Sequence, residues 1–465
     1  MDASDLADQL TPRTSAANGW YGLGIIALAS IVGSIVAKGV IPLISESLRI
    51  SLRLTDQHLG LINGLALTFI TAIATIPVGW LADKMDRRWL LSICVMIWSA
   101  GSVAFGLSTH FPALFVAAMA IGLGEAVLGP VTYSMIPDLF PRSKWVAVNS
   151  VFVATVLVGS YVGMGLAGTL LGFVTNNRGA VPAIVAGLEP WRIAMLVVAT
   201  GGPLLALMLL FLRLERITLP GVPMATNRDV IDHFKTHARA LTGIFFGFGV
   251  SYAAFGANGV WSPVIVQRVF GADPANIGQV LGYGSAVCSL VGVFMGVLLA
   301  RRFRPRYGDQ TALMIAQWAL LGGLIVALFM PFAQTVTQYY TIVLVKLGLT
   351  FMATSLAPTV LQLIAPARMR GRVIAIGGMV TILFGSIMPL MVGTLSAAFA
   401  GPRGILNAMS AVVIPSFAVG LLFLWWGSKA VPATLRAVEV ADAGEVSPTD
   451  GEPHETGAAE ALQAG

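Results

Sequence analysis

The chain has 465 residues, of which 56% are hydrophobic and only 11% are charged, and its formal net charge is +6. Soluble domains carry roughly 25% charged residues, so this composition excludes a soluble fold and predicts an all-α integral membrane protein. The two cysteines, Cys94 and Cys288, lie in apolar stretches, which excludes a disulfide framework.

Twelve apolar stretches are long enough to cross a hydrocarbon core of about 30 Å, which takes roughly 20 residues as a helix. The first begins near Gly19 and is too long for a signal-peptide core, so we expect it to stay as a membrane helix. Glycines in the fifth and eleventh stretches would allow those two helices to be broken or strongly tilted. In chain order we predict spans at 19–44, 57–82, 89–108, 111–136, 145–174, 191–212, 241–267, 276–300, 310–333, 338–364, 373–400 and 405–431.

A polar central segment divides the spans into six and six. The final segment is rich in alanine, glycine and acidic residues, so we expect it to be disordered. We therefore divide the chain into an N-terminal cytoplasmic tail at 1–18, an N-terminal six-helix bundle at 19–212, a cytoplasmic central loop at 213–240, a C-terminal six-helix bundle at 241–431 and a disordered acidic tail at 432–465.

The distribution of lysine and arginine predicts the orientation of the chain. If both termini lie inside, 20 of the 28 basic residues fall on cytoplasmic segments and six fall on outer loops. We therefore expect a multi-pass protein with cytoplasmic termini, in a bacterial inner membrane. Because the positive residues are spread over seven cytoplasmic segments, the net charge follows from topology and indicates no nucleic-acid partner.

The two halves share a weak internal repeat, and its matches occur in the same order in each half. This order indicates two bundles related by an axis normal to the membrane, as in many transporters. The matches are Gly39–Ile44 with Gly259–Ile265, Asp56–Gly60 with Asp273–Gly278, and Pro130 with Pro358, each proline being followed by a basic loop, at Arg142 and at Arg368.

The loop after the second span carries a recognisable motif. It reads Gly79-Trp80-Leu81-Ala82-Asp83-Lys84-Met85-Asp86-Arg87-Arg88 and resembles the G-x-L-A-D-R-x-x-R-R signature of the major facilitator superfamily. The resemblance implies twelve transmembrane helices in two pseudo-symmetric six-helix bundles. Asp83, Arg87 and Arg88 would then act as a conformational switch, because a carboxylate between helix ends and a basic cluster can lock and release the cytoplasmic ends of the two halves.

A narrower resemblance runs through the fourth and fifth spans. Gly122-Leu123-Gly124-Glu125-Ala126, then Pro130, then Ile136-Pro137-Asp138-Leu139-Phe140-Pro141 and Lys144 look like the pattern of the Spinster-like branch. Members of that branch usually carry an Asp-Arg pair in the first span and an Arg seven residues before the fourth-span Glu. This chain has no Asp in its first span and has Ala118 at that Arg position, so its coupling chemistry departs from the branch.

Three charged residues lie deep inside the predicted spans, away from their ends. A lone charge near the bilayer centre costs at least about 2.5 to 3.5 kcal/mol, so such residues usually face a cavity and are functional. At about 1.5 Å per residue, Glu125 is roughly 21 Å below the outer end of its span, and Lys38 and Lys346 are about 9 and 12 Å deep. When the halves are aligned, Lys346 falls opposite Ala118 and Lys38 falls opposite Asn258.

The resemblance implies that the first, fourth, seventh and tenth spans line a central cavity, and we place Lys38, Glu125, Asn258 and Lys346 around it. Two cations and one anion would favour an anionic substrate. Glu125 is the one deep carboxylate, and desolvation favours its neutral form, so it is our candidate for proton coupling. Our candidate substrate-binding residues are Lys38, Asn258, Lys346, Tyr133 and Trp261. The structural alternatives are that the lysines only anchor their helices and that Glu125 only bonds a neighbouring backbone.

These features predict a secondary transporter that moves a small organic anion or amphipathic metabolite by alternating access, coupled to protons. Two alternatives stay open: a Spinster-like exporter of a lysolipid or similar lipid, and a facilitative uniporter, channel or sensor without ion coupling. We predict no enzyme, because no nucleophile has a base partner. We expect no cofactor and no metal, and the expected partners of a monomeric chain are the substrate, protons and membrane lipids.

Overall fold

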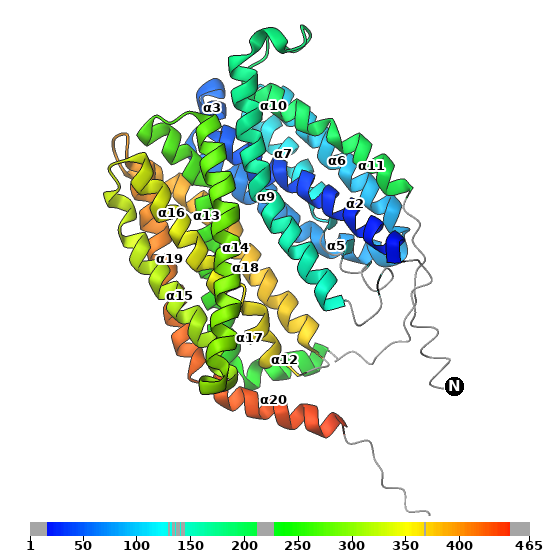
Figure 1. The fold of residues 1–465 in the computed structure, drawn as a ribbon, viewed down its shortest axis with the longest axis vertical. Helices are drawn as coiled ribbons and strands as arrows, with labels where there is room; N and C mark the ends of the chain where they lie inside the picture. Colours follow the sequence, from blue (N-terminus) through cyan, green and yellow to red (C-terminus); the bar gives the residue numbers. More distant parts are fainter. Residues whose placement is uncertain are drawn as a thin grey trace, which may run out of the picture.

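The computed structural model describes residues 16–128, 131–132, 135, 140, 145–211, 227–366 and 369–446, and every regular element in these ranges is helical (Figure 1). Ten helical stretches are long and apolar enough to cross a membrane, and one of them, Pro274–Phe332, holds two helices joined by a tight turn. With the shorter apolar helix at Phe111–Glu125, the described residues contain twelve spans. The expected all-α membrane fold is confirmed.

The N-terminal bundle contains two spans that combine α-helical and π-helical segments. The wider turns of a π-helix are frequent at functional sites, and Lys38 lies in one of them. Its elements are α2 (Ala16–Ser34), η1 (Ile35–Val40), α3 (Ile41–Leu52), α4 (Asp56–Gly60), η2 (Leu61–Phe69), α5 (Ile70–Lys84), α6 (Arg87–Leu107), α7 (Phe111–Glu125), α9 (Trp145–Asn176), the 3₁₀ turn η4 (Arg178–Ala180), α10 (Pro190–Ala199) and α11 (Gly201–Leu210).

The C-terminal bundle follows a short amphipathic helix, α12, and ends in a further helix, α20. Its elements are α12 (Asn227–Thr236), α13 (Ala238–Phe270), α14 (Pro274–Tyr307), η5 (Gly308–Gln310), α15 (Thr311–Leu328), η6 (Met330–Phe332), α16 (Val336–Thr354), α17 (Ala357–Leu363), α18 (Arg370–Leu395), η8 (Ser396–Ala398), α19 (Gly404–Ser428) and α20 (Val431–Val446).

The C-terminal tail differs from the sequence expectation in its first part. We expected disorder from residue 432 onward, whereas the structure has a helix from Val431 to Val446, in which Thr434 and Val438 are buried. Residues 447–465 lie outside the described residues, as do residues 1–15 of the N-terminal tail and 212–226 of the central loop.

We call the end that carries α12 and α20 the inner end, because the sequence predicts that it faces the cytoplasm. The opposite end, with α3 and α10, is the outer end (Figure 1). The halves meet mainly along α9 and α14 and along η2, α4 and α18. In Figure 1 the helices of the two halves diverge from these contacts toward the inner end.

The glycines of the fifth span permit close packing of the two halves, and α9 itself is one unbroken helix. A Cβ atom on Gly168 would lie 2.8 Å from the Cα of Gly278 on α14, and one on Gly282 would collide with the backbone of Gly165. Side chains at these positions would force the helices apart. The eleventh span, α18, is likewise continuous from Arg370 to Leu395, so neither glycine-rich span is broken.

Candidate substrate and coupling site

An ion pair joins two helical segments of the N-terminal bundle. The Nζ of Lys38 on η1 donates to the Oε1 of Glu125, the last residue of α7, at 2.8 Å. The Lys38 side chain is 57% exposed and that of Glu125 is 13% exposed. Lys38 also interacts electrostatically with Tyr252 of α13, from the other half. The pair therefore lies on the side of the N-terminal bundle that faces the other half.

Tyr252 belongs to a cluster of aromatic rings that comes from both halves. Tyr161 on α9 packs edge-on against Phe351 on α16, with ring centroids 6.2 Å apart. Phe351 in turn contacts Phe255, whose ring lies 5.1 Å from that of Tyr252. The hydroxyl of Tyr161 is buried and has no hydrogen-bond partner among the described residues. A buried hydroxyl without a partner is costly, so it is available to bond a substrate.

The other predicted pair lies inside the C-terminal bundle. Lys346 on α16 is only 2% exposed, and its Nζ donates to the Oδ1 of Asn258 on α13 at 2.7 Å. Trp261, one turn further along α13, is fully buried, and its Nε1 donates to the backbone oxygen of Pro389 on α18 at 3.0 Å. The structure thus brings the four charged and amide residues together as two separate pairs. Tyr133 lies outside the described residues.

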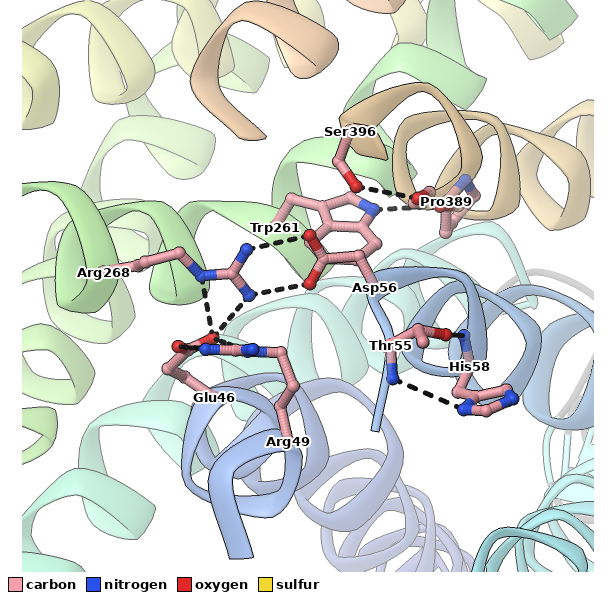
Figure 2. A network of polar contacts seen from close by, with 10 residues as sticks. Glu46, Arg49, Thr55, Asp56, His58, Trp261, Arg268, Pro389 and Ser396 are labelled. Atoms are coloured by element: carbon pink, nitrogen blue, oxygen red, sulfur yellow. Dashed lines mark hydrogen bonds and ion pairs between the residues drawn. The ribbon is translucent and has the colours of Figure 1, made fainter. Parts of the chain in front are cut away.

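A network of ion pairs joins the halves at the outer end (Figure 2). Arg268 on α13 donates to Glu46 of α3 at 2.6 Å and to Asp56 of α4 at 2.7 Å. Arg49 also donates to Glu46, at 2.8 Å. Glu46 is 3% exposed and Arg268 is held by two carboxylates, so this is a partly buried, bidentate clamp. We call these four residues the outer network.

The outer network lies beyond the spans that the sequence predicts. The first and seventh predicted spans end at residues 44 and 267, which places Arg49 and Arg268 in outer loops. In the structure α3 continues to Leu52 and α13 to Phe270, which brings their charged ends together. Glu46, a carboxylate two residues beyond an apolar span, was the available signal.

The loop between the second and third spans is described in part. Arg88 pairs with Asp86, the N-cap of α6, at 2.6 Å, and the Asp86 side chain also accepts from the Arg88 backbone. The Arg88 guanidinium lowers the pKa of Asp86 below its usual value. The side chain of Asp83 lies outside the described residues, and Arg87 begins α6. The role of these residues as a switch stays a prediction.

Comparison with known proteins places this arrangement in a family. The profile of the Major Facilitator Superfamily matches residues 23–389, so the chain belongs to that superfamily, whose members are transporters. The chain is similar to an MFS-type efflux pump of Mycolicibacterium smegmatis, with 22% identity over 91% of this chain and 95% of the relative.

Other relatives support the Spinster-like branch. The sphingosine-1-phosphate transporter SPNS2 of Danio rerio is 22% identical over 73% of this chain and 69% of its own. The crystal structure of a bacterial homologue of the human lysosomal transporter Spinster, in an inward-facing and unoccupied conformation, superposes with a TM-score of 0.70. It shares 20% identity and covers 92% of this chain and 99% of its own. The Spinster-like resemblance seen in the fourth and fifth spans is confirmed.

Proposed function

We propose that this transporter couples the movement of an amphipathic organic anion to protons, by alternating access in a bacterial inner membrane. The observation that carries the proposal is the ion pair between Lys38 and Glu125. In this pair a carboxylate and a cation contact each other on the side of the N-terminal bundle that faces the other half. A proton on Glu125 would remove its charge and release Lys38 to bind an anion. Proton binding and anion binding would then favour each other, so the two move together.

The substrate class follows from what surrounds Lys38. Lys38 interacts with Tyr252, and the ring of Tyr252 belongs to a cluster with Phe255, Phe351 and Tyr161, so the site suits a molecule with one anionic group and an apolar body. A lysolipid is a second candidate, because its phosphate would bind Lys38 while its chain contacts the rings. The name of the SPNS2 relative, which gives a lipid phosphate as its cargo, supports this candidate.

The outer network supports a conformation that is closed at the outer end and reached from the inner end. Arg268 joins the halves there, and the glycine contacts of α9 with α14 keep the outer parts of the helices together. Rocking of the halves would break the network and expose Lys38 and Glu125 to the outer side. The orientation itself rests on the distribution of basic residues.

A transport experiment tests the proposal. Purified protein in proteoliposomes, with a pH-sensitive dye inside, is exposed to a panel of organic anions and lysophospholipids. We expect one class to drive proton flux in the wild type, and Glu125→Gln to keep ligand movement while losing the proton flux. Equal ligand movement without proton flux in both proteins would make the chain a uniporter and Glu125 a structural residue.

A further inference from the structure

The interior of the C-terminal bundle encloses an amine. The Nζ of Lys346 contacts the Oδ1 of Asn258 at 2.7 Å and the Sδ of Met330 at 3.6 Å. Asn258 belongs to α13, and Met330 begins the turn η6 that follows α15. With 2% of its surface exposed, Lys346 is held by elements of its own half and does not face the space between the halves in this conformation.

No carboxylate in this half can neutralise an ammonium at Lys346. Between residues 238 and 428 the only acidic residues are Asp273 and Asp309, at the two ends of α14. Asp273 caps the first turn of that helix, and Asp309 pairs with Arg304.

The elements packed against α16 add only neutral or positive groups. These elements are α13, α14, α15, α17 and η6, of which the last three carry no titratable side chain, and α9, which contacts Phe351 through Tyr161. The titratable and charged groups on α13 and α14 are Arg239, Tyr252, Arg268, Tyr283, Cys288, Arg301, Arg302, Arg304, Arg306 and Tyr307, and α16 itself adds Tyr339 and Tyr340. A positive charge on Lys346 would therefore be buried without an opposite charge.

The contacts of the amine match its neutral form. An ammonium has three N–H donors, whereas a neutral amine has two and a lone pair, and Lys346 has two partners. The Nδ2 of Asn258 donates to the backbone oxygen of Ala254 at 2.7 Å. A flip of the Asn258 amide, which would point this donor at the amine, would break that hydrogen bond. Burying an ammonium without an opposite charge is strongly unfavourable, so the neutral amine is the favoured form.

We propose that Lys346 and Asn258 form a proton-binding site in the C-terminal bundle. The amine is neutral in this conformation, and its lone pair takes one proton from hydronium when the bundle admits water, and returns it when the site closes. Toward the outer end, the buried hydroxyls of Tyr339 and Ser262 lie 3.2 Å apart on the same two helices and continue the polar interior. This inference rests on the proposed proton-coupled function and adds a second proton site, separate from Glu125.

Nuclear magnetic resonance of the full-length protein tests the charge state. The chain has six lysines, so protein carrying ¹³C at the lysine Cε in lipid nanodiscs gives few signals. The signal lost in Lys346→Arg is that of Lys346, and the other five serve as references. We expect it to show a neutral amine at pH 8 and to titrate as the pH falls. An ammonium signal up to pH 9 would overturn the proposal.

Thermal unfolding gives a second readout that needs no substrate. A neutral amine in the folded protein binds fewer protons than the ammonium of the unfolded chain, so the stability of the wild type rises with pH. Relative to Lys346→Met, the unfolding constant of the wild type should fall by up to tenfold per pH unit from pH 7 to 9. Lys235→Met, at the inner surface, is the control. A constant ratio would contradict the proposal.

The two proposals can fail separately. If Glu125→Gln leaves proton flux intact, the proposed coupling role of Glu125 fails while the titration of Lys346 is unaffected. If Lys346 stays charged, the second site fails while coupling through Glu125 stands. If Lys346→Met does not fold, the resonance experiment still tests the charge of Lys346. It needs only the labelled wild type and one variant that assigns the signal, which is Lys346→Arg or, in its place, Lys346→Gln.

Discussion

Arg268 binds Asp56 and Glu46 at once, although these carboxylates lie 212 and 222 residues before it in the chain. One guanidinium thus spans the outer ends of α3, α4 and α13 and joins the two halves (Figure 2). Because α13 belongs to one bundle and α3 and α4 to the other, any movement that separates the outer ends must break these bonds. Arg268 is therefore a residue whose contacts hold the outer ends of the two halves together.

Replacing Arg268 should open the outer end. In Arg268→Gln, Asp56 loses its ion-pair partner and Glu46 keeps only Arg49. Loss of one partner of a buried ion pair destabilises a fold by about 3 to 5 kcal/mol, and here the closed outer end is what loses this stability. Electron spin resonance between labels at Ile50 and Phe332, exposed residues of the two halves, should report a longer distance. Arg53→Ala, at the C-terminal end of α3, is the control. An unchanged distance in Arg268→Gln would show that packing alone closes this end.

A single methyl group between α9 and α14 should have a similar effect. In Gly168→Ala the new Cβ lies 2.8 Å from the Cα of Gly278 and 2.9 Å from the backbone oxygen of Ala275, and neither backbone atom can move freely. Overpacking of this kind costs about 1 to 3 kcal/mol. The same pair of spin labels should move apart. Gly259→Ala on α13 is the control, because it makes the same change in helix propensity as Gly168→Ala. Its new Cβ has no atom within 4 Å, so the distance between the labels should stay unchanged.

The sequence predicted the elements of this fold well, because twelve apolar stretches of suitable length leave little choice in a bilayer. It predicted the partners of the charged residues less well. Lys38 and Glu125 were expected to share a cavity, and they form an ion pair. Lys346 and Asn258 were placed by pseudo-symmetry at the same cavity, and they bond each other in the bundle interior. Periodicity gives the face of a helix, but which neighbour covers that face depends on tertiary packing.

The outer network escaped prediction for a different reason. The end of an apolar stretch predicts where a span leaves the hydrocarbon core. Charged residues beyond that end are therefore predicted to lie in loops. Glu46 and Arg268 belong to helical turns that continue past the predicted ends, where each charge is stabilised by a partner from the other half. Such partners are more than 200 residues apart in sequence, so no local pattern reveals them.

Acidification should loosen α12 from the C-terminal bundle. The Nε2 of His233 on α12 lies 3.0 Å from the backbone oxygen of Ile364, and burial lowers the pKa of His233. The docked state therefore binds fewer protons than the released helix, whose histidine has a pKa of about 6.5. Docking is complete above that value and is lost as the pH falls through the lower pKa of the docked histidine.

Hydrogen exchange of α12 between pH 7.5 and 5.5 measures this effect. After correction for intrinsic exchange rates, protection of Asn227–Thr236 should decrease in the wild type as the pH falls. In His233→Asn the pH dependence should weaken. His110→Gln, at the outer end of the molecule, should behave as the wild type. Protection that is independent of pH in the wild type would mean that His233 does not control docking.

Replacing Lys38 and replacing Glu125 should have opposite effects on anion binding. In Lys38→Gln the cation that would bind the anion is absent, so anions should bind weakly. In Glu125→Gln the cation of Lys38 is free, so anions should bind without a proton. The double variant should resemble Lys38→Gln in anion binding, because the cation is absent from both. The interaction energy between the two residues in this double-mutant cycle should be about 0.5 to 3 kcal/mol. Binding of the transported anion, measured by calorimetry at pH 6 and pH 8, separates these cases, with Asp309→Asn as a carboxylate-to-amide control away from the site. Equal pH dependence in the wild type and in Glu125→Gln would assign the coupling proton to another group.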